Sequence, residues 1–521
     1  MEETIGRAVQ TAASRARQTG RPVLASVVLP LADRLPGGAW AAAACEALGS
    51  EPRVVMVAPD GGPALVGFGV AWQLTAEGPE RFETVRRDFS RLAASAVRIA
   101  GDSAQDGEPG TGLVAAGAFR FDPERPVDPG WEGIPDAAFV VPRLLLTWVA
   151  PSGPVYLTVN VPVRPDTDVE TAVARASTEA RALVRAMQVA HPIEPTWEGE
   201  GPEGQAPAAA GRRWEADHVV PDGKDAEVRR WQARVGLAVQ AIRQGSLDKV
   251  VLARSEEVRA TGPFDLRQLV RALAGQCSSS ARFLLSFGTA RGQGWWVGAS
   301  PEVLAACRAG TELRTVALAG SAPRGATPQE DAALGESLLA NPKQQAEHRW
   351  VVEAVREALA PLAASLEVPQ SPRLLKLPYV QHLCTPITSR LRPGRSLLDV
   401  VAALHPTPAV GGHPREAALR WLREHEDLDR GWYAAPVGWW DAAGNGEFWV
   451  AIRSARLWVD DGGGPIRATL FAGCGIVADS DPHDEWVESA LKLRAMRQLL
   501  AQAGLLGKAE KEEVGARRAA I

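Results

Sequence analysis

Cysteine is scarce in the 521-residue sequence, and its five positions are scattered: Cys45, Cys277, Cys307, Cys384 and Cys474. Their number is odd, and no two of them form a Cys-x-x-Cys pair. A disulfide framework usually needs an even set of cysteines, and a structural zinc site needs closely spaced ligands. The cysteine pattern therefore argues against both.

Long apolar runs and an excess of basic charge are also lacking. No stretch reaches the length of about 18 apolar residues that a membrane-spanning helix needs. The first residues, MEETIGRAVQTAASRARQTG, form an amphipathic helix pattern without the apolar centre of an export signal. The formal net charge is −5, which does not favour a nucleic-acid-binding surface. We expect a cytoplasmic protein with a small-molecule ligand, and neither a membrane nor a nucleic acid as partner.

A compositional break divides the chain into two patterned halves. Residues 191–213, rich in proline, glycine, alanine and glutamate, predict a linker or surface loop. Residues 1–190 contain short strand-like runs and helices, and we expect this α/β half to pack into the same fold as the rest. The sharper patterns of residues 214–507 mark the region that carries the candidate chemistry, and residues 508–521 predict a frayed, charged tail.

Strands in the second half occur in runs and do not alternate strictly with helices. GEFWVAIRSARLWVDD and PIRATLFAGCGIVAD flank a glycine-rich turn, which indicates an antiparallel hairpin. Asn341 and Pro342 mark the start of one helix, and another is expected to begin near Pro482. This pattern favours an α+β fold, a large sandwich of antiparallel sheets with flanking helices.

Two glutamates three residues apart begin the last predicted helix. Glu485, Glu488 and Lys492 lie at positions i, i+3 and i+7, on one helix face. A solvated surface is the ordinary interpretation of such a face. However, these residues follow the glycine-rich strand LFAGCGIV, and Glu347 lies early in the helix that starts near Asn341. Converging carboxylates suit Mg²⁺, which prefers oxygen ligands, so we predict Mg²⁺ as the cofactor.

Eight stretches, in order and at compatible spacings, resemble the chorismate-utilising enzymes, specifically the isochorismate synthases. They are SLDKVVLAR, GASPEVL, ALAGSAPRG, NPKQQAEH, LHPTPAVGG, RGWYAAPVGWWD, EFWVAIRSA and LFAGCGIVADSDPHDEWVESALK. The resemblance covers roughly residues 214–503. The first half is only loosely similar to the variable part of the longer, menaquinone-type members.

The resemblance implies a magnesium-dependent, reversible isomerisation of chorismate, in which water attacks C2 and the C4 hydroxyl leaves. Lys249 would be the base that activates water, and Glu302 the acid that protonates the leaving hydroxyl. An apolar strand around Lys249 would lower the pKa of its ammonium, and apolar surroundings would keep Glu302 protonated. Without the resemblance, an outward-facing lysine and a turn glutamate are the simpler interpretations.

The resemblance also implies a set of binding residues. Glu347 and Glu488 would ligate Mg²⁺, Glu485 would assist directly or through water, and Lys492 would meet a substrate carboxylate. Gln344 stands where many relatives carry an acid, which implies a less acidic outer shell. The other predicted substrate-binding residues are Gly320, Ser321, His405, Ala409, Tyr433, Arg453 and Gly473. For His405, a purely structural role remains the alternative.

Two other functions remain open. A salicylate synthase would use the same lysine and acid and then eliminate pyruvate, although HPTPAVGG and RGWYAAPVGWW are more similar to enzymes that stop at isochorismate. A catalytically silent chorismate-binding protein would need neither base nor acid. The long first half favours menaquinone supply by analogy, and the sequence leaves the oligomeric state open.

Overall fold

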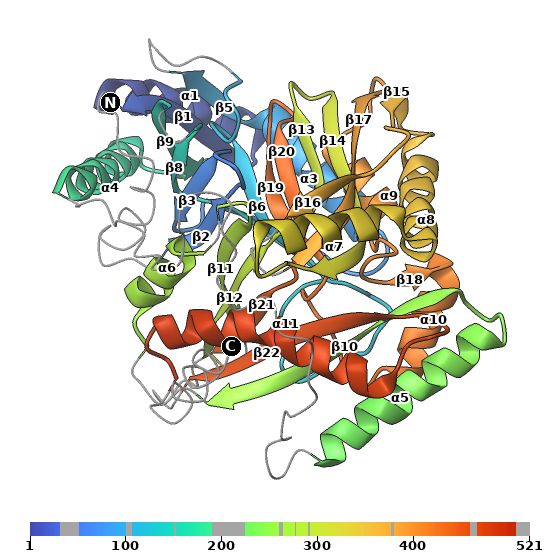
Figure 1. Ribbon diagram of the computed structural model, residues 1–521. Helices are drawn as coiled ribbons and strands as arrows, with labels where there is room; N and C mark the ends of the chain where they lie inside the picture. Colours follow the sequence, from blue (N-terminus) through green and yellow to red (C-terminus); the bar gives the residue numbers. More distant parts are fainter. Residues whose placement is uncertain are drawn as a thin grey trace.

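Two large β-sheets form the centre of the computed structural model (Figure 1). The structure describes residues 1–31, 52–100, 107–150, 153–189, 225–259, 264–276, 278–289, 292–376, 380–458 and 466–506. The predicted linker at 191–213 and the predicted tail at 508–521 lie outside these residues.

One sheet has 12 strands in the order β18-β10-β22-β21-β12-β11-β2-β3-β8-β9-β1-β5. Its neighbours pair antiparallel, except that β1 and β5 are parallel. The strands are β1 (Val23–Leu31), β2 (Pro52–Val57), β3 (Ala64–Phe68), β5 (Val97–Ala100), β8 (Leu144–Trp148), β9 (Val155–Val163), β10 (Lys249–Arg259), β11 (Ala281–Thr289), β12 (Gly292–Ser300), β18 (Gly412–His413), β21 (Ser454–Trp458) and β22 (Arg467–Ile476).

The other sheet has 10 strands, which pair antiparallel in the order β15-β17-β14-β13-β20-β19-β6-β7-β4, with β16 also paired to β17. The strands are β4 (Trp72–Ala76), β6 (Val114–Phe119), β7 (Ala137–Val141), β13 (Val303–Arg308), β14 (Glu312–Pro323), β15 (Ala363–Glu367), β16 (Arg373–Lys376), β17 (Val380–Leu391), β19 (Pro436–Asp441) and β20 (Gly446–Val450).

Helices flank both sheets (Figure 1). They are α1 (Glu2–Thr19), α3 (Arg81–Ser95), α4 (Val169–Val189), α5 (Asp225–Arg243), α6 (Leu266–Ala274), α7 (Pro328–Ala340), α8 (Pro342–Leu359), α9 (Leu397–Leu404), α10 (Arg415–His425) and α11 (Pro482–Gln502). Among the described helices, none is both long and apolar enough to cross a bilayer.

The 12-stranded sheet is buried on both faces, and β2 shows how the sequence achieves this. Val54 and Met56 belong to the core shared with the second sheet, whereas Val55 and Val57 pack in the core beneath α1, α4, α6 and α11. Successive side chains of a strand point to opposite faces, so a strand covered on both sides reads as a continuous apolar run. The predicted α+β sandwich of antiparallel sheets with flanking helices is confirmed.

Strands from both sides of residues 190–224 share each sheet. β2 pairs with β11 in the 12-stranded sheet, and β6 pairs with β19 in the 10-stranded one. The predicted hairpin of β21 and β22 is present. However, GEFWVAIRSARLWVDD is not one strand: β20 and β21 lie in different sheets, because the chain turns at Arg453.

Candidate active site

Two connections between the sheets are held together, and each carries a predicted site residue. Glu302 lies between β12 and β13, where the chain leaves the 12-stranded sheet. Arg453 lies between β20 and β21, where the chain enters that sheet again. The Val450 N–H donates to the Glu302 carbonyl and the Ala299 N–H donates to the Arg453 carbonyl, each at 3.0 Å. The junction of the sheets therefore brings Glu302 and Arg453 together.

Lys249 is the first residue of β10, and a glycine of the neighbouring strand makes room for it. A Cβ at Gly475 would lie 2.9 Å from Lys249 Cε. Gly475 pairs with Val251, which makes it a diagonal neighbour of Lys249 across the two strands. Burial lowers the pKa of the Lys249 ammonium, although nearby carboxylates, first Glu347 and then Glu302, oppose the shift. A neutral amine is therefore more accessible here than on a free lysine.

The Glu302 carboxyl has the opposite shift. Burial raises its pKa to about 7, although the charges of Lys249 and Arg453 lower it. Its side chain lines a small cavity together with Thr407 and the predicted site residue Ala409. Near neutral pH, Glu302 is therefore able to hold a proton that it could donate.

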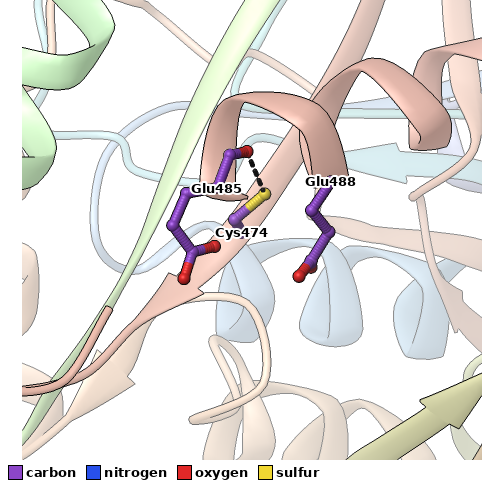
Figure 2. Close-up of side chains that lie close together, drawn as sticks. All are labelled: Cys474, Glu485 and Glu488. Carbon is purple, nitrogen blue, oxygen red and sulfur yellow. Dashed lines mark hydrogen bonds between the residues drawn. The ribbon is translucent and has the colours of Figure 1, made fainter. Parts of the chain in front are cut away.

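The acidic cluster lies at the start of α11. The helix begins where predicted: Asp481 caps it by accepting hydrogen bonds from the backbone N–H groups of residues 483 and 484, and Pro482 is the first helical residue. Glu485 and Glu488 project from its first turns toward β22 (Figure 2). The Cys474 thiol of β22 completes the group, with one ligand atom from each residue within 4.8 Å of the others. The two glutamates and the thiol thus form a group of candidate ligand atoms, with Glu488 at its exposed side.

The two carboxylate oxygens of Glu485 differ in their contacts. Its Oε1 accepts a hydrogen bond of 2.7 Å from Ser480 Oγ, which itself accepts one from the Val477 N–H. Its Oε2 is buried and has no hydrogen-bond partner within the described part of the chain. Burial raises the pKa of this carboxyl to about 7, and the charge of Glu488 adds to the rise. A buried acceptor without a partner is costly, so this carboxylate oxygen suits a hard cation such as Mg²⁺.

Lys492 connects the cluster to β22. Its ammonium lies 2.5 Å from Glu488 Oε1 and donates a 2.8 Å hydrogen bond to the Gly473 carbonyl. Burial would raise the pKa of Glu488, but the charge and hydrogen bond of Lys492, together with Arg453, hold it below its ordinary value. Glu488 is therefore ionised, as a ligand of a cation must be.

Glu347 belongs to the same site but not to the three-residue group. Among the described residues, the close donor group contains Cys474 in place of the predicted Glu347. Glu347, on α8, is instead the carboxylate that acts most strongly on Lys249. A cation shared with Glu488 would require the two carboxylates to approach each other, or a water between them.

A bulge in β14 carries Gly320 and Ser321. The pairing with β17 shifts register at Gly320, whose φ of +79° favours glycine. The Ser321 N–H donates a 3.2 Å hydrogen bond to Gln344 Oε1. A Cβ at Gly320 would lie 2.9 Å from the same oxygen. Gln344 therefore supports the bulge through its side-chain oxygen.

His382 is a site residue that the sequence reasoning missed. Its Nδ1 is 2.8 Å from Ser321 Oγ. Burial lowers its pKa to about 4, and Arg453 lowers it further, so the ring is neutral. Its signal in the sequence was weak, because its partner Ser321 is brought opposite to it only by the pairing of β17 with β14. Gly475 was missed because its neighbour Lys249 is distant in the sequence, whereas Ser480 and Cys474 lie near Glu485 in the sequence but belong to residue types with no role in the predicted site.

Tyr433 lies beside Arg453 and Gly473, as the resemblance implied. It is 5% exposed and stacks on Phe471, with ring centroids 5.3 Å apart. Its hydroxyl would lie 3.2 Å from a Cβ at Gly473. Burial raises the pKa of this hydroxyl, which therefore remains a hydrogen-bond donor. The hydroxyl and the Arg453 guanidinium offer a place for a carboxylate.

His405 differs from the other predicted residues. Its Nε2 donates a 2.9 Å hydrogen bond to the Phe121 carbonyl, and its ring packs against Phe82 and Phe121. Burial lowers its pKa to about 3, with the charge of Arg81 adding to the effect. The contacts described for His405 involve neither Lys249 nor Glu302. They give no support to a substrate-binding role and fit the alternative structural role.

A protein family and several known proteins are similar to this chain over most of its length. A family model described as "Chorismate binding enzyme" matches residues 8–501. The "Salicylate biosynthesis isochorismate synthase" of Pseudomonas aeruginosa is 39% identical, over 85% of this chain and 83% of its own. "Isochorismate synthase MenF" of Bacillus subtilis is 33% identical, over 84% of this chain and 85% of its own.

A solved structure agrees in fold. The menaquinone-specific isochorismate synthase MenF of Escherichia coli has a TM-score of 0.66 at 24% identity, over 95% of this chain and all of its own. The family match and the relatives show that the chain belongs to the chorismate-binding enzyme family.

Proposed function

We propose that the protein is an isochorismate synthase, an isomerase that converts chorismate reversibly to isochorismate. One observation carries this proposal: a lysine whose pKa is lowered and a glutamic acid whose pKa is raised lie in the same site. Two groups with opposite shifts form the acid and base pair that a hydroxyl transposition needs. The names of the relatives at 39% and 33% identity support the same reaction.

In the proposed mechanism, the Lys249 amine removes a proton from water as that water attacks C2 of the ring. The double bonds shift, and the C4 hydroxyl leaves as water after accepting the proton of Glu302. One water is consumed and one is released, so the atoms balance. Arg453 and the Tyr433 hydroxyl would hold the enolpyruvyl carboxylate, as their planar guanidinium and phenolic donor suit this task.

We also propose Mg²⁺ as the cofactor, held by Glu488 and Glu485 with Glu347 completing the set. When bound, the ion would neutralise the ring carboxylate of the substrate and orient it. The chain's own contribution is positional: Ser480 fixes one oxygen of Glu485, and Lys492 fixes one of Glu488. The bulge at Gly320 lies against Gln344 of α8, the helix that also carries Glu347.

Product analysis tests the proposed function. Purified protein incubated with chorismate and Mg²⁺ is expected to form isochorismate, and EDTA should abolish turnover because the acidic ligands would then be left without their cation. Chromatography should resolve isochorismate, salicylate and pyruvate. Salicylate with an equal amount of pyruvate would make the protein a salicylate synthase, and no conversion in either condition would favour a silent binding protein.

Replacing Ser480 by alanine is expected to weaken Mg²⁺ binding by about 10–100-fold, the usual effect of losing a residue that orients a metal ligand. The variant loses the hydroxyl that fixes Glu485 Oε1. Calorimetric titration of the substrate-free protein with Mg²⁺ measures this directly. Ser396→Ala, which removes the cap of α9, is the control and should leave Mg²⁺ affinity unchanged. Equal affinities in both variants would contradict the role of Ser480.

Supply of isochorismate for menaquinone synthesis remains our prediction for the pathway. A menaquinone-type relative is 33% identical. A relative named for salicylate biosynthesis is 39% identical over a similar share of the chain. Loss of menaquinone on deletion of the coding sequence in the source organism, restored by added isochorismate, would support the prediction.

A further inference from the structure

A thiol lies among the carboxylates of the proposed cation site. Cys474 Sγ, Glu485 and Glu488 each offer a ligand atom within 4.8 Å of the others (Figure 2). Cys474 is fully buried in β22, between Gly473 and Gly475, and it is held from two elements because its S–H donates a 3.3 Å hydrogen bond to the Glu485 carbonyl of α11. Its position relative to the helix is therefore fixed.

The three residues differ in how they could meet an ion. Glu488 is exposed, which gives an ion a route from solvent, while Cys474 is at the buried end of the group. Among the residues that the structure describes, the buried Glu485 Oε2 of the same group has no hydrogen-bond partner. A donor set of two carboxylates and one thiol is unusual for Mg²⁺, which prefers oxygen alone, but it suits borderline and soft divalent ions.

We propose that Cys474, Glu485 and Glu488 form a site for thiophilic divalent cations such as Zn²⁺ and Cd²⁺, which compete with Mg²⁺ for the same two carboxylates. Zn²⁺ bonds to thiolate at about 2.3 Å and to carboxylate at about 2.0–2.2 Å. The three ligand atoms, which now lie within 4.8 Å of one another, would have to turn toward a common point to reach those distances. This site uses the same two carboxylates as the Mg²⁺ site of the proposed function, but binding of a thiophilic cation requires no substrate and can be measured without turnover.

Binding changes one proton and two contacts. The sulfur–metal bond forms as the thiol proton leaves to solvent, and the hydrogen bond from the thiol to the Glu485 carbonyl is lost. The carboxylate of Glu488 exchanges its ion pair with Lys492 for the cation. No oxidant or reductant is involved.

Cadmium titration of the full-length, magnesium-free protein tests the site. The expected result is one Cd²⁺ per chain with a thiolate-to-cadmium charge-transfer absorption, and a lower apparent affinity when Mg²⁺ is present. Removing a direct ligand should cost at least as much as losing an orienting partner, which is about 10–100-fold. Cys474→Ser should therefore lose the absorption and bind Cd²⁺ at least about tenfold more weakly.

One control and two further variants complete the test. Cys307→Ala removes a buried cysteine of β13 outside the group and should keep the absorption. Glu488→Gln should keep the charge-transfer absorption, because the thiol remains, but should bind Cd²⁺ more weakly, because one carboxylate is lost. Cys474→Ala replaces Cys474→Ser if circular dichroism shows that the serine variant is unfolded. An absorption that persists without Cys474, that ignores Glu488, or that Mg²⁺ does not affect would overturn the inference.

The titration separates this inference from the proposed function. A protein that gives the absorption but converts no chorismate supports the thiol site and contradicts the isomerase. A protein that converts chorismate with Mg²⁺ but gives no absorption keeps the isomerase and overturns the thiol site.

Discussion

Replacing Lys249 by methionine is expected to lower kcat for chorismate by about 10²–10⁴-fold, the usual contribution of a general base. Methionine has a similar length and fills the space over Gly475, so the loss should come from the missing amine and not from a cavity. KM should change much less than kcat, because the proposed role lies in the reaction and not in binding. Steady-state rates of isochorismate formation at saturating Mg²⁺ provide the measurement.

Lys376→Met is the matched control for this variant. Lys376 also pairs with a carboxylate, Asp331, which keeps its contacts to Arg324 when the lysine is lost. Its turnover should remain near that of the wild type. If Lys249→Met kept most of its kcat, a different group would have to activate water, and the assignment of the base would be wrong.

Replacing Glu302 by glutamine is expected to lower kcat by a similar factor of about 10²–10⁴ and to change its pH dependence. Glutamine keeps the shape of the side chain but cannot donate a proton to the leaving hydroxyl. Burial raises the pKa of Glu302 to about 7. The acid is therefore protonated below that pH and is lost as pH rises through it, so the kcat of the wild type should decline above about pH 7.

The pH profile distinguishes an acid from a structural residue. In Glu302→Gln the decline on the alkaline side should disappear, since no proton remains to be lost there. Glu447→Gln is the control, because burial also raises the pKa of Glu447, yet this residue pairs with Trp449 and Arg308 inside the 10-stranded sheet. A decline that persists in Glu302→Gln and vanishes in Glu447→Gln would contradict the assignment.

The sequence predicted the fold class and the residues that lie within a motif. The antiparallel sandwich follows from runs of strands, and the start of α11 follows from Pro482. The strand break at Arg453 was not predicted, because EFWVAIRSA is apolar enough to continue as one strand. The chain turns there because β20, before Arg453, pairs in the 10-stranded sheet and β21, after it, pairs in the 12-stranded sheet.

The site was less predictable where partners are distant in sequence. His382 and Ser321 meet only because β17 pairs with β14. Among the described residues, the close group of candidate ligand atoms around Glu488 contains Cys474 and does not contain Glu347. A sequence motif indicates which residues belong to a site, but it does not show which of their atoms are in contact. For His405, the motif suggested a place in the site, whereas its Nε2 donates a hydrogen bond to the Phe121 carbonyl, 284 positions away in the chain.

The pairing of β2 with β11 and of β6 with β19 has a consequence for any attempt to isolate a smaller catalyst. A fragment starting at Asp225 would keep all the residues proposed for the chemistry, yet it would lose the partner of one strand in each sheet. Those strands would become long, apolar edges with unpaired backbone groups, the surfaces from which chains aggregate. A minimal version of this protein would therefore have to redesign two sheet edges before it removed any of the first half.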